Sequence, residues 1–453
     1  MKKQRPPMML TVLLAAILIG ATALHAAGPT PLAMATYRRF LPIVQRSYRA
    51  PEPCLPEIDE DRLLLTIDTD GDLNQLWAAD WNGDGWTDVV VARLVFQTAE
   101  TFEISILLND QQGGLVDATQ EVFEGPIPEV QHPREIVIAD FNGDARPDIF
   151  VADHGMDTDP FPGYQNTLVL SAPGGKLVDA TGRLPQRDDY THSATAADID
   201  ADGDVDLYVG NMGGEGEEAP CILLNDGTGG FTLAEGRLPP EQIDLTLNWY
   251  GSCQFADVNN DGSPDLILGQ GDPNRYSHVL TNDGTGHFTK LETPLPPTIF
   301  FPIHGIMDIK ASDISGDGYL DLFLIDTRNT YVGRYIQILI NNRDGTFVDE
   351  TSTRISQTYH DGWLVYLQLL DLNYDGHVDF VARQLTGPGP LFYLNDGHGV
   401  FSEWDHGLDL YTFDFLDFDR DGRRDILNSG SAFDGSPEWH AIMRHIGCQQ
   451  TGP

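Results

Sequence analysis

Closely spaced aspartates are the residues of this 453-residue chain best placed to do chemistry. One pattern, D-x-[D/N/S]-x-D-[G/A]-x-x-D, occurs seven times, and such self-similarity at a near-constant period indicates a repeat architecture. Successive copies start 56 to 60 residues apart, except that the last follows after 46. The copies begin at Asp80, Asp140, Asp198, Asp257, Asp313, Asp371 and Asp417.

Oxygen-bearing side chains occupy positions 1, 3, 5 and 9 of every copy, and glycine occupies position 6 in six of them. Hard oxygen ligands at odd spacings around a glycine turn, with a backbone carbonyl available at position 7, suit calcium. No histidine or cysteine takes a ligand position, which disfavours zinc and copper. We predict up to seven structural calcium sites, with the ligands Asp80, Asn82, Asp84, Asp88; Asp140, Asn142, Asp144, Asp148; Asp198, Asp200, Asp202, Asp206; Asp257, Asn259, Asp261, Asp265; Asp313, Ser315, Asp317, Asp321; Asp371, Asn373, Asp375, Asp379; and Asp417, Asp419, Asp421, Asp425.

Electrostatic repulsion explains why these loops need a counter-charge. Two carboxylates ~4 Å apart repel by about 4 kcal/mol at an effective dielectric constant of about 20, and each loop holds three or four of them. The alternative is a set of Asp/Asn-rich turns without metal. Two loops should bind calcium least tightly: loop two has Ala145 where the others have glycine, and loop five has the neutral ligand Ser315.

The segments around each loop predict short β-strands. An apolar stretch precedes each loop, a β-branched run follows it, and further on another strand-like run ends in an Asn-Asp-Gly type of turn, as in ILLNDGTGGF from Ile222. Each repeat therefore comprises four strands with the metal loop between the first two. Four-stranded units repeated radially form a β-propeller, so we predict an all-β, seven-bladed propeller. A solenoid would need polar capping repeats, which the sequence does not show.

The ends of the repeat region predict how the ring closes. The last repeat lacks a fourth strand, and the segment DRLLLTI from Asp61 is a spare strand at the other end. If this N-terminal strand completes the last blade, no sheet edge is left open. Cys54 and Cys448 then lie at the same end of that blade, which predicts a disulfide between them. Cys221 and Cys253 form either a second bridge or two buried thiols.

The N-terminal residues predict export from the cell. Basic residues precede an apolar run from Met8 to about Leu24, and the small residues after it fit signal-peptide cleavage after Ala23, Ala26 or Ala27. We predict a signal peptide over 1–27, a Pro-rich linker over 28–57, a propeller over 58–448, and a secreted or cell-surface protein without a stable transmembrane anchor. The net charge of −42 argues against nucleic acid as a partner and against anionic lipid.

The loops opposite the metal sites carry polar and aromatic residues, among them Arg275 and His304. Some calcium-loop propellers similar to this chain are polysaccharide lyases. That resemblance makes His132, Arg134, His154 and His192, from the second and third repeats, candidates for removing a proton beside a uronate carboxylate. The alternative is that each histidine satisfies loop backbone, and the similar offsets of His132 and His192 from the next loop favour it.

The loops and the NDGTGGF-type turns resemble FG-GAP and VCBS-type repeats, the calcium-loop propellers related to the N-terminal headpiece of integrin α subunits. The resemblance covers about residues 60–448, although the Phe-Gly…Gly-Ala-Pro phrase of FG-GAP repeats is not visible. It implies an extracellular, calcium-stabilised propeller for adhesion or recognition of a glycan or protein. The alternatives are a polysaccharide lyase or hydrolase and a purely structural surface component, because a fold alone does not fix a function.

Overall fold

The computed structural model describes residues 55–68, 73–94, 99–156, 158–159, 161–212, 218–244, 250–271, 275–302, 304–328, 332–357, 362–386, 389–405, 412–429 and 438–449. The predicted signal peptide, most of the predicted linker, and Cys54 lie outside these ranges. Along them, no helix is both long and apolar enough to span a lipid bilayer.

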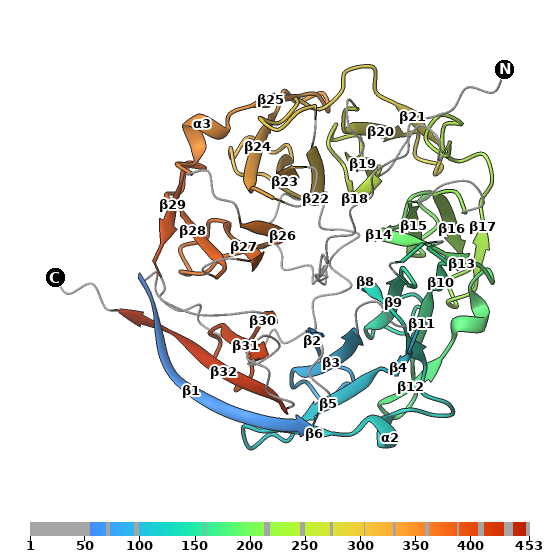
Figure 1. Ribbon diagram of the computed structural model, residues 1–453, viewed down its shortest axis with the longest axis vertical. Coiled ribbons are helices and arrows are strands. Elements are labelled where there is room, and N and C mark those ends of the chain that lie inside the picture. Colours follow the sequence, from blue (N-terminus) through green and yellow to red (C-terminus); the bar gives the residue numbers. More distant parts are fainter. Residues whose placement is uncertain are drawn as a thin grey trace.

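The chain folds into an all-β propeller whose four-stranded antiparallel sheets stand around a central axis (Figure 1). We number six of these sheets as blades in chain order. Blade one is β2 (Leu73–Ala79), β3 (Asp88–Leu94), β5 (Ser105–Asn109) and β6 (Leu115–Asp117). Blade two is β8 (Pro133–Ala139), β9 (Asp148–Asp153), β11 (Thr167–Ala172) and β12 (Lys176–Asp179). Blade three is β14 (Thr191–Ala197), β15 (Asp206–Asn211), β16 (Cys221–Asn225) and β17 (Phe231–Leu233).

The remaining blades repeat this order. Blade four is β18 (Tyr250–Ala256), β19 (Asp265–Gln270), β20 (His278–Asn282) and β21 (Phe288–Lys290). Blade five is β22 (His304–Ser312), β23 (Asp321–Arg328), β24 (Tyr335–Asn341) and β25 (Phe347–Asp349). Blade six is β26 (Trp363–Leu370), β27 (Asp379–Thr386), β28 (Leu391–Asn395) and β29 (Phe401–Trp404).

One further four-stranded sheet, which we call the terminal sheet, joins distant parts of the chain. Its order is β1 (Leu55–Asp68), β32 (Glu438–Gln449), β31 (Asp425–Ser429) and β30 (Thr412–Leu416). The outermost strand β1 starts before the expected Asp61, so residues 55–57 of the predicted linker are strand, with Pro56 opposite Cys448. Proline is tolerated there because an outermost strand has one side without a sheet partner.

Short helical turns and two-residue strands lie in the connections between the blade strands. The helices α2 (Thr119–Val122) and α3 (Thr351–Arg354) and the 3-10 turn η1 (Thr181–Arg183) are each one turn long. Two pairs of two-residue strands, β4 (Phe102–Glu103) with β7 (Glu129–Val130) and β10 (Tyr164–Gln165) with β13 (Asp188–Asp189), add short antiparallel contacts at the loops.

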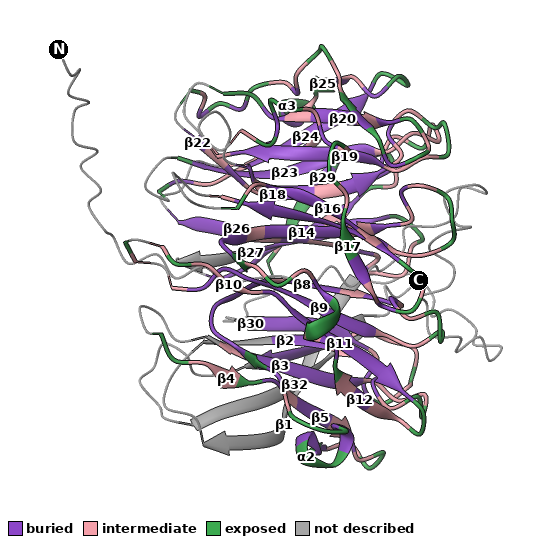
Figure 2. Cartoon of the chain, turned by 90° about the vertical axis from the view of Figure 1, so that its right-hand side faces the viewer, coloured by how far each residue is buried: buried purple, intermediate pink, exposed green. Residues whose placement is uncertain are grey.

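The hydrophobic core lies between neighbouring blades rather than inside one sheet. The second strand of blades two, three and four is buried at every residue, because another blade covers each of its faces (Figure 2). One cluster, for example, packs Phe141 and Phe150 of blade two against Leu207 and Val209 of blade three. The near-continuous apolar runs after each metal loop are therefore strands buried on both sides.

The aspartate at position 9 of each loop begins the second strand and fastens the loop to the blade. In blade three, Asp206 Oδ2 accepts a hydrogen bond from Ile199 N (3.3 Å) and Oδ1 accepts one from Asn225 N (2.8 Å). Blade one repeats both contacts at Asp88, with Trp81 N and Asn109 N. We call this contact the aspartate latch; it joins the loop to the third strand of the same blade.

In blades three, four and five, an asparagine at the end of the third strand fastens the blade to the one before it. Asn225 Nδ2 donates to Val205 O of its own blade (3.0 Å) and to Phe141 O in the metal loop of blade two (2.8 Å). Asn282 and Asn341 make the same pair of contacts one and two blades further on. We call these contacts asparagine clamps. They couple the stability of neighbouring blades, because metal loops two, three and four are each held by a residue of the next blade.

Ionisable side chains of the first strands line a void shared by blades two to six, which we call the central channel. Glu135 of blade two accepts from Ala194 N of blade three (2.9 Å), and Asp308 of blade five accepts from Leu367 N of blade six (2.8 Å). Asp308 also pairs with Lys310 (2.6 Å). Burial raises the pKa of Glu135 to about 8 although Lys310 lowers it, so this carboxyl is largely protonated at neutral pH.

Loss of one asparagine clamp should destabilise the propeller. Asn282→Ala removes hydrogen bonds to Ile199 O and Pro264 O, and unsatisfied buried carbonyls cost about 1–3 kcal/mol each. We expect urea unfolding to show a loss of that order. Asn342→Ala, in an exposed bond of the equivalent turn of blade five, should change stability by less than about 0.5 kcal/mol. Equal losses in the two variants would contradict the clamp.

The channel carboxyl should make stability depend on pH. Because the folded-state pKa of Glu135 is raised, the folded protein binds more protons than the unfolded chain, and stability falls as pH rises from about 4.5 to about 8. Glu135→Gln mimics the protonated form. Urea unfolding at pH 5 and pH 8 should therefore show the variant gaining stability relative to the wild type at the higher pH. A difference that is constant with pH would rule this out.

Candidate metal-binding loops

All seven predicted loops connect the first and second strands of their sheets, and their backbones are compact. In loop one, Asp80 Oδ1 accepts hydrogen bonds from Gly83 N (2.7 Å) and Asp84 N (3.0 Å), and Oδ2 accepts one from Gly85 N (2.8 Å). Loops four, five and six make the same bonds from positions 5 and 6 to the first aspartate. The carboxylate at position 1 is thus held under the turn.

The turn needs left-handed backbone at two positions, of which sequence reasoning found one. Position 6 has positive φ in all seven loops, including the non-glycine residue Ala145 (φ 65°). Position 4 is also left-handed, as at Ala201 (φ 61°) and Tyr374 (φ 59°). The available signal was the glycine at position 4 of loops one, two and five.

Two loops bring three carboxylates to a common point. Single oxygens of Asp198, Asp200 and Asp206 in loop three lie within 4.8 Å of one another. The equivalent residues of loop seven, Asp417, Asp419 and Asp425, do the same. These are the two loops with aspartate at position 3. The other five offer an asparagine or serine oxygen there, so each has one carboxylate fewer.

The oxygens in these two loops fit a divalent cation. Among the described residues, Asp198 Oδ1, Asp200 Oδ1 and Asp417 Oδ1 are buried and have no hydrogen-bond partner. A buried carboxylate oxygen is costly unless a hydrogen bond or a cation compensates for its lost hydration. Burial, together with the negative charges of Asp421 and Asp419, raises the pKa of Asp417 to about 6 although a bond from Gly422 N lowers it. An oxygen-only donor set of this charge suits calcium.

Position 5 of the two loops predicted to bind calcium least tightly already has a cationic neighbour. In loop two, Arg146 pairs with Asp144 (2.6 Å), which also accepts from Ser171 Oγ. In loop five, Arg343 of the following turn pairs with Asp317 (2.8 Å). An arginine on a ligand carboxylate competes with a metal ion, so the weaker binding of loops two and five remains our prediction with a second physical reason.

The structure brings together the four residues considered for proton abstraction. The rings of His132 and His154, and those of His154 and His192, have centroids 4.5 Å apart, and the void beside them is lined by Arg134 and His192. His132, Arg134 and His154 are buried. Burial, followed by the charge of Arg134, lowers the pKa of His132 to about 3.

The histidine contacts match the structural alternative. His154 Nδ1 lies 3.0 Å from Gly155 O, and His192 Nδ1 lies 3.3 Å from Tyr190 O, so both rings are held by loop carbonyls. The neighbouring void measures about 30 Å³, room for water rather than for a sugar ring. The described geometry places these groups together without giving a polysaccharide access to them.

Cys221 and Cys253 do not form the second bridge; both are free, buried thiols. The physical reason is their packing. Cys221 lies in the core between blades two and three, and Cys253 lies in the core between blades three and four. Burial raises the pKa of Cys221 to about 12, which keeps it protonated and unreactive at neutral pH.

Comparisons with known proteins agree with this geometry. Residues 80–151, 140–209, 257–324 and 313–382 match the FG-GAP-like repeat. Over 275 residues the chain is 24% identical to a T-cell immunomodulatory protein homolog of Plasmodium yoelii yoelii, a match covering 58% of this chain and 36% of that protein. The chain thus spans only about a third of that relative.

Two solved structures align with the chain at TM-scores just below 0.5. An Agrocybe aegerita lectin, described as recognising non-reducing terminal N-acetylglucosamine, shares 18% identity with a TM-score of 0.48, covering 73% of this chain and 79% of the lectin. BBS1N in complex with ARL6DN shares 10% identity with a TM-score of 0.49, covering 86% of this chain and 98% of that one. The FG-GAP match spans more than half of the sequence, each matched segment beginning at a metal loop, and the chain therefore belongs to the FG-GAP-like repeat family.

Proposed function

We propose that this protein is a secreted, calcium-stabilised propeller that recognises a glycan or a protein outside the cell. The observation that carries recognition is the distribution of exposed apolar side chains. Tyr276, Ile299 and Val332 are 39%, 62% and 38% exposed, and they lie on loops of blades four and five at the end opposite the metal loops. Ile243, 39% exposed, lies on the loop that enters blade four. Exposed apolar groups gathered on consecutive loops favour a binding surface.

Calcium at up to seven loops is the stabilising part of the proposal. The partnerless carboxylate oxygens of loops three and seven support it. The remaining five loops share the backbone turn and the positions of three carboxylates, so we extend the proposal to them. A bound cation would compensate for the repulsion among these carboxylates, and the aspartate latches would pass that stabilisation to the blade cores.

We further propose a seven-bladed ring closed by the N-terminal strand. The backbone register of β1 on β32 supports it. So do contacts of the terminal sheet with both neighbours: Asn109 of blade one donates to Phe418 O (3.0 Å), in the manner of an asparagine clamp, and Asp414 accepts from Ala78 N (3.1 Å) and from Gln368 Nε2 of blade six (2.9 Å). The Cys54–Cys448 disulfide stays a prediction, because Cys54 lies outside the described residues.

The proposal that the protein is exported rests on the sequence of residues 1–27 and on the calcium concentration that the loops would need. Outside the cell, calcium is plentiful, and weak sites can be filled. Secretion or attachment to the cell surface is therefore the setting in which these loops would work. We do not propose the lyase or hydrolase, because His132 and His154 are buried and the void beside them and His192 is too small for a sugar ring.

Removal of calcium should destabilise the protein. A ligand at about 100 times its Kd adds about 2.7 kcal/mol per site to folding, so EGTA should lower the melting temperature strongly. Asp200→Asn should reproduce part of that loss and reduce the number of ions measured by calorimetric titration. Asp204→Asn, which removes a charge from the same loop but no predicted side-chain ligand, is the control. A melting curve that does not change on chelation would contradict the calcium proposal.

The calcium-loaded protein should bind in a screen of glycans and extracellular proteins. Ile299→Asp, at an exposed position of the loop surface, should weaken that binding at least about tenfold, since a charge would be desolvated at the contact. Val348→Asp, 43% exposed on the outer strand β25, is the matched control. If the protein binds nothing in the screen, the purely structural role is favoured. If Ile299→Asp and Val348→Asp weaken binding equally, the loop surface is not the binding surface.

A further inference from the structure

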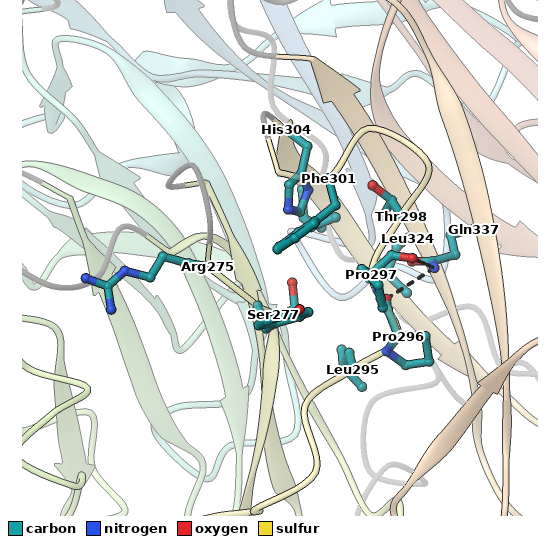
Figure 3. Close-up of a pocket in the computed structure, with 12 residues that line it drawn as sticks. Arg275, Ser277, Leu295, Pro296, Pro297, Thr298, Phe301, His304, Leu324 and Gln337 are labelled. Atoms are coloured by element: carbon teal, nitrogen blue, oxygen red, sulfur yellow. Dashed lines mark hydrogen bonds between the residues drawn. The ribbon is translucent and has the colours of Figure 1, made fainter.

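A small pocket lies between blades four and five, within the loop surface proposed above. Its mouth includes the exposed Tyr276, whose ring stacks on Phe301 with centroids 4.7 Å apart. Its deeper residues, Ser277, His304 and Gln337, are buried (Figure 3). The cavity measures about 10 Å³, so it admits one group the size of a water molecule.

The pocket contains two buried hydrogen-bond acceptors. His304 Nδ1 lies 3.2 Å from Asp326 Oδ1, and the tautomer that carries its proton on Nδ1 donates a hydrogen bond to this carboxylate and leaves Nε2 as an acceptor. Gln337 Nε2 donates to Asp349 Oδ2 (2.9 Å) and to Pro296 O (3.2 Å), which makes Oε1 the free end of the amide. Within the described part of the chain, neither His304 Nε2 nor Gln337 Oε1 has a hydrogen-bond partner.

These acceptors define the group that can enter. Ser277 Oγ accepts from Gln270 N (3.0 Å), which leaves its hydroxyl proton available for donation. A hydroxyl group, like a water molecule, can donate to His304 or Gln337 and accept from Ser277. A carboxylate cannot donate, and the guanidinium of Arg275 points away from the pocket (Figure 3). The acidic surface of the protein, with a net charge of −42, also repels anionic ligands.

We propose that this pocket, which we call the blade 4–5 pocket, binds one terminal unit of a neutral glycan. One hydroxyl of a hexopyranose enters the cavity between His304 and Gln337. The apolar face of the sugar ring rests on Tyr276, whose position is fixed by its stack on Phe301. The inference rests on the proposed recognition function and names its site and ligand class.

The test uses calorimetry with full-length, calcium-loaded protein and a panel of neutral methyl hexopyranosides, with the matching uronates as the acidic arm. We expect at least one neutral sugar to bind and the uronates to bind more weakly. Tyr276→Ala should weaken binding about three- to tenfold, as for loss of an aromatic contact. His304→Phe should abolish binding by removing the acceptor. Leu233→Ala, 42% exposed on the outer strand β17, is the matched control and should bind like the wild type.

The outcomes separate this inference from the broader function. If the screen of glycans and proteins finds a partner but no neutral hexoside binds, or if Tyr276→Ala binds like the control, the blade 4–5 pocket is not the site although recognition stands. Competition by a proline-rich peptide instead of a sugar would also overturn it. If the screen finds no partner at all, recognition and this inference fall together. His304 pairs with buried Asp326, so the melting temperature of His304→Phe must be measured first. If His304→Phe does not fold, the binding of Tyr276→Ala decides the question.

Discussion

The aspartate latch is the contact on which the rest of this structure depends. In the six numbered blades, one buried carboxylate ties the metal loop to the start of the second strand and to the end of the third. Burial raises the pKa of Asp206 to about 7 even though two backbone hydrogen bonds lower it, so the latch is under electrostatic strain. A cation in the loop would relieve that strain at the point where three strands and the loop meet.

The asparagine clamps extend this local contact around the propeller. Each clamp uses the metal loop of the preceding blade as its acceptor, so a loop that opens removes support from two sheets. The channel carboxyl groups of Glu135 and Asp308 make a second set of inter-blade contacts near the axis. Between these two sets lie the apolar clusters that neighbouring blades share. The blades are therefore coupled at the metal loops, in the core and at the channel.

Local patterns made most of this architecture predictable. The strands of each repeat, the position of every metal loop and the left-handed turn at position 6 follow from short local motifs, and the near-constant period of those motifs predicts the repeat. The two-residue strands β4, β7, β10 and β13 are too short to show a periodicity in the sequence. Their pairing is determined by the loops that contain them. Asn225 could be recognised only as a turn residue, because its partner Phe141 lies 84 positions away. The pocket around His304 was not predictable either, because its other polar residues, Asp326 and Gln337, also lie far from His304 in the sequence.

The lengths of the outer strands have a consequence for solubility. In blades one, three, four and five the outermost strand has three residues, and in blades two and six it has four. Each offers so few open backbone groups that a second molecule cannot extend the sheet across it. The long exception, β1, contains Pro56 and four acidic residues between positions 57 and 61, which oppose such pairing by a missing amide and by charge. The short outer strands and the acidic, proline-containing β1 therefore disfavour amyloid-like pairing of the sheet edges between molecules.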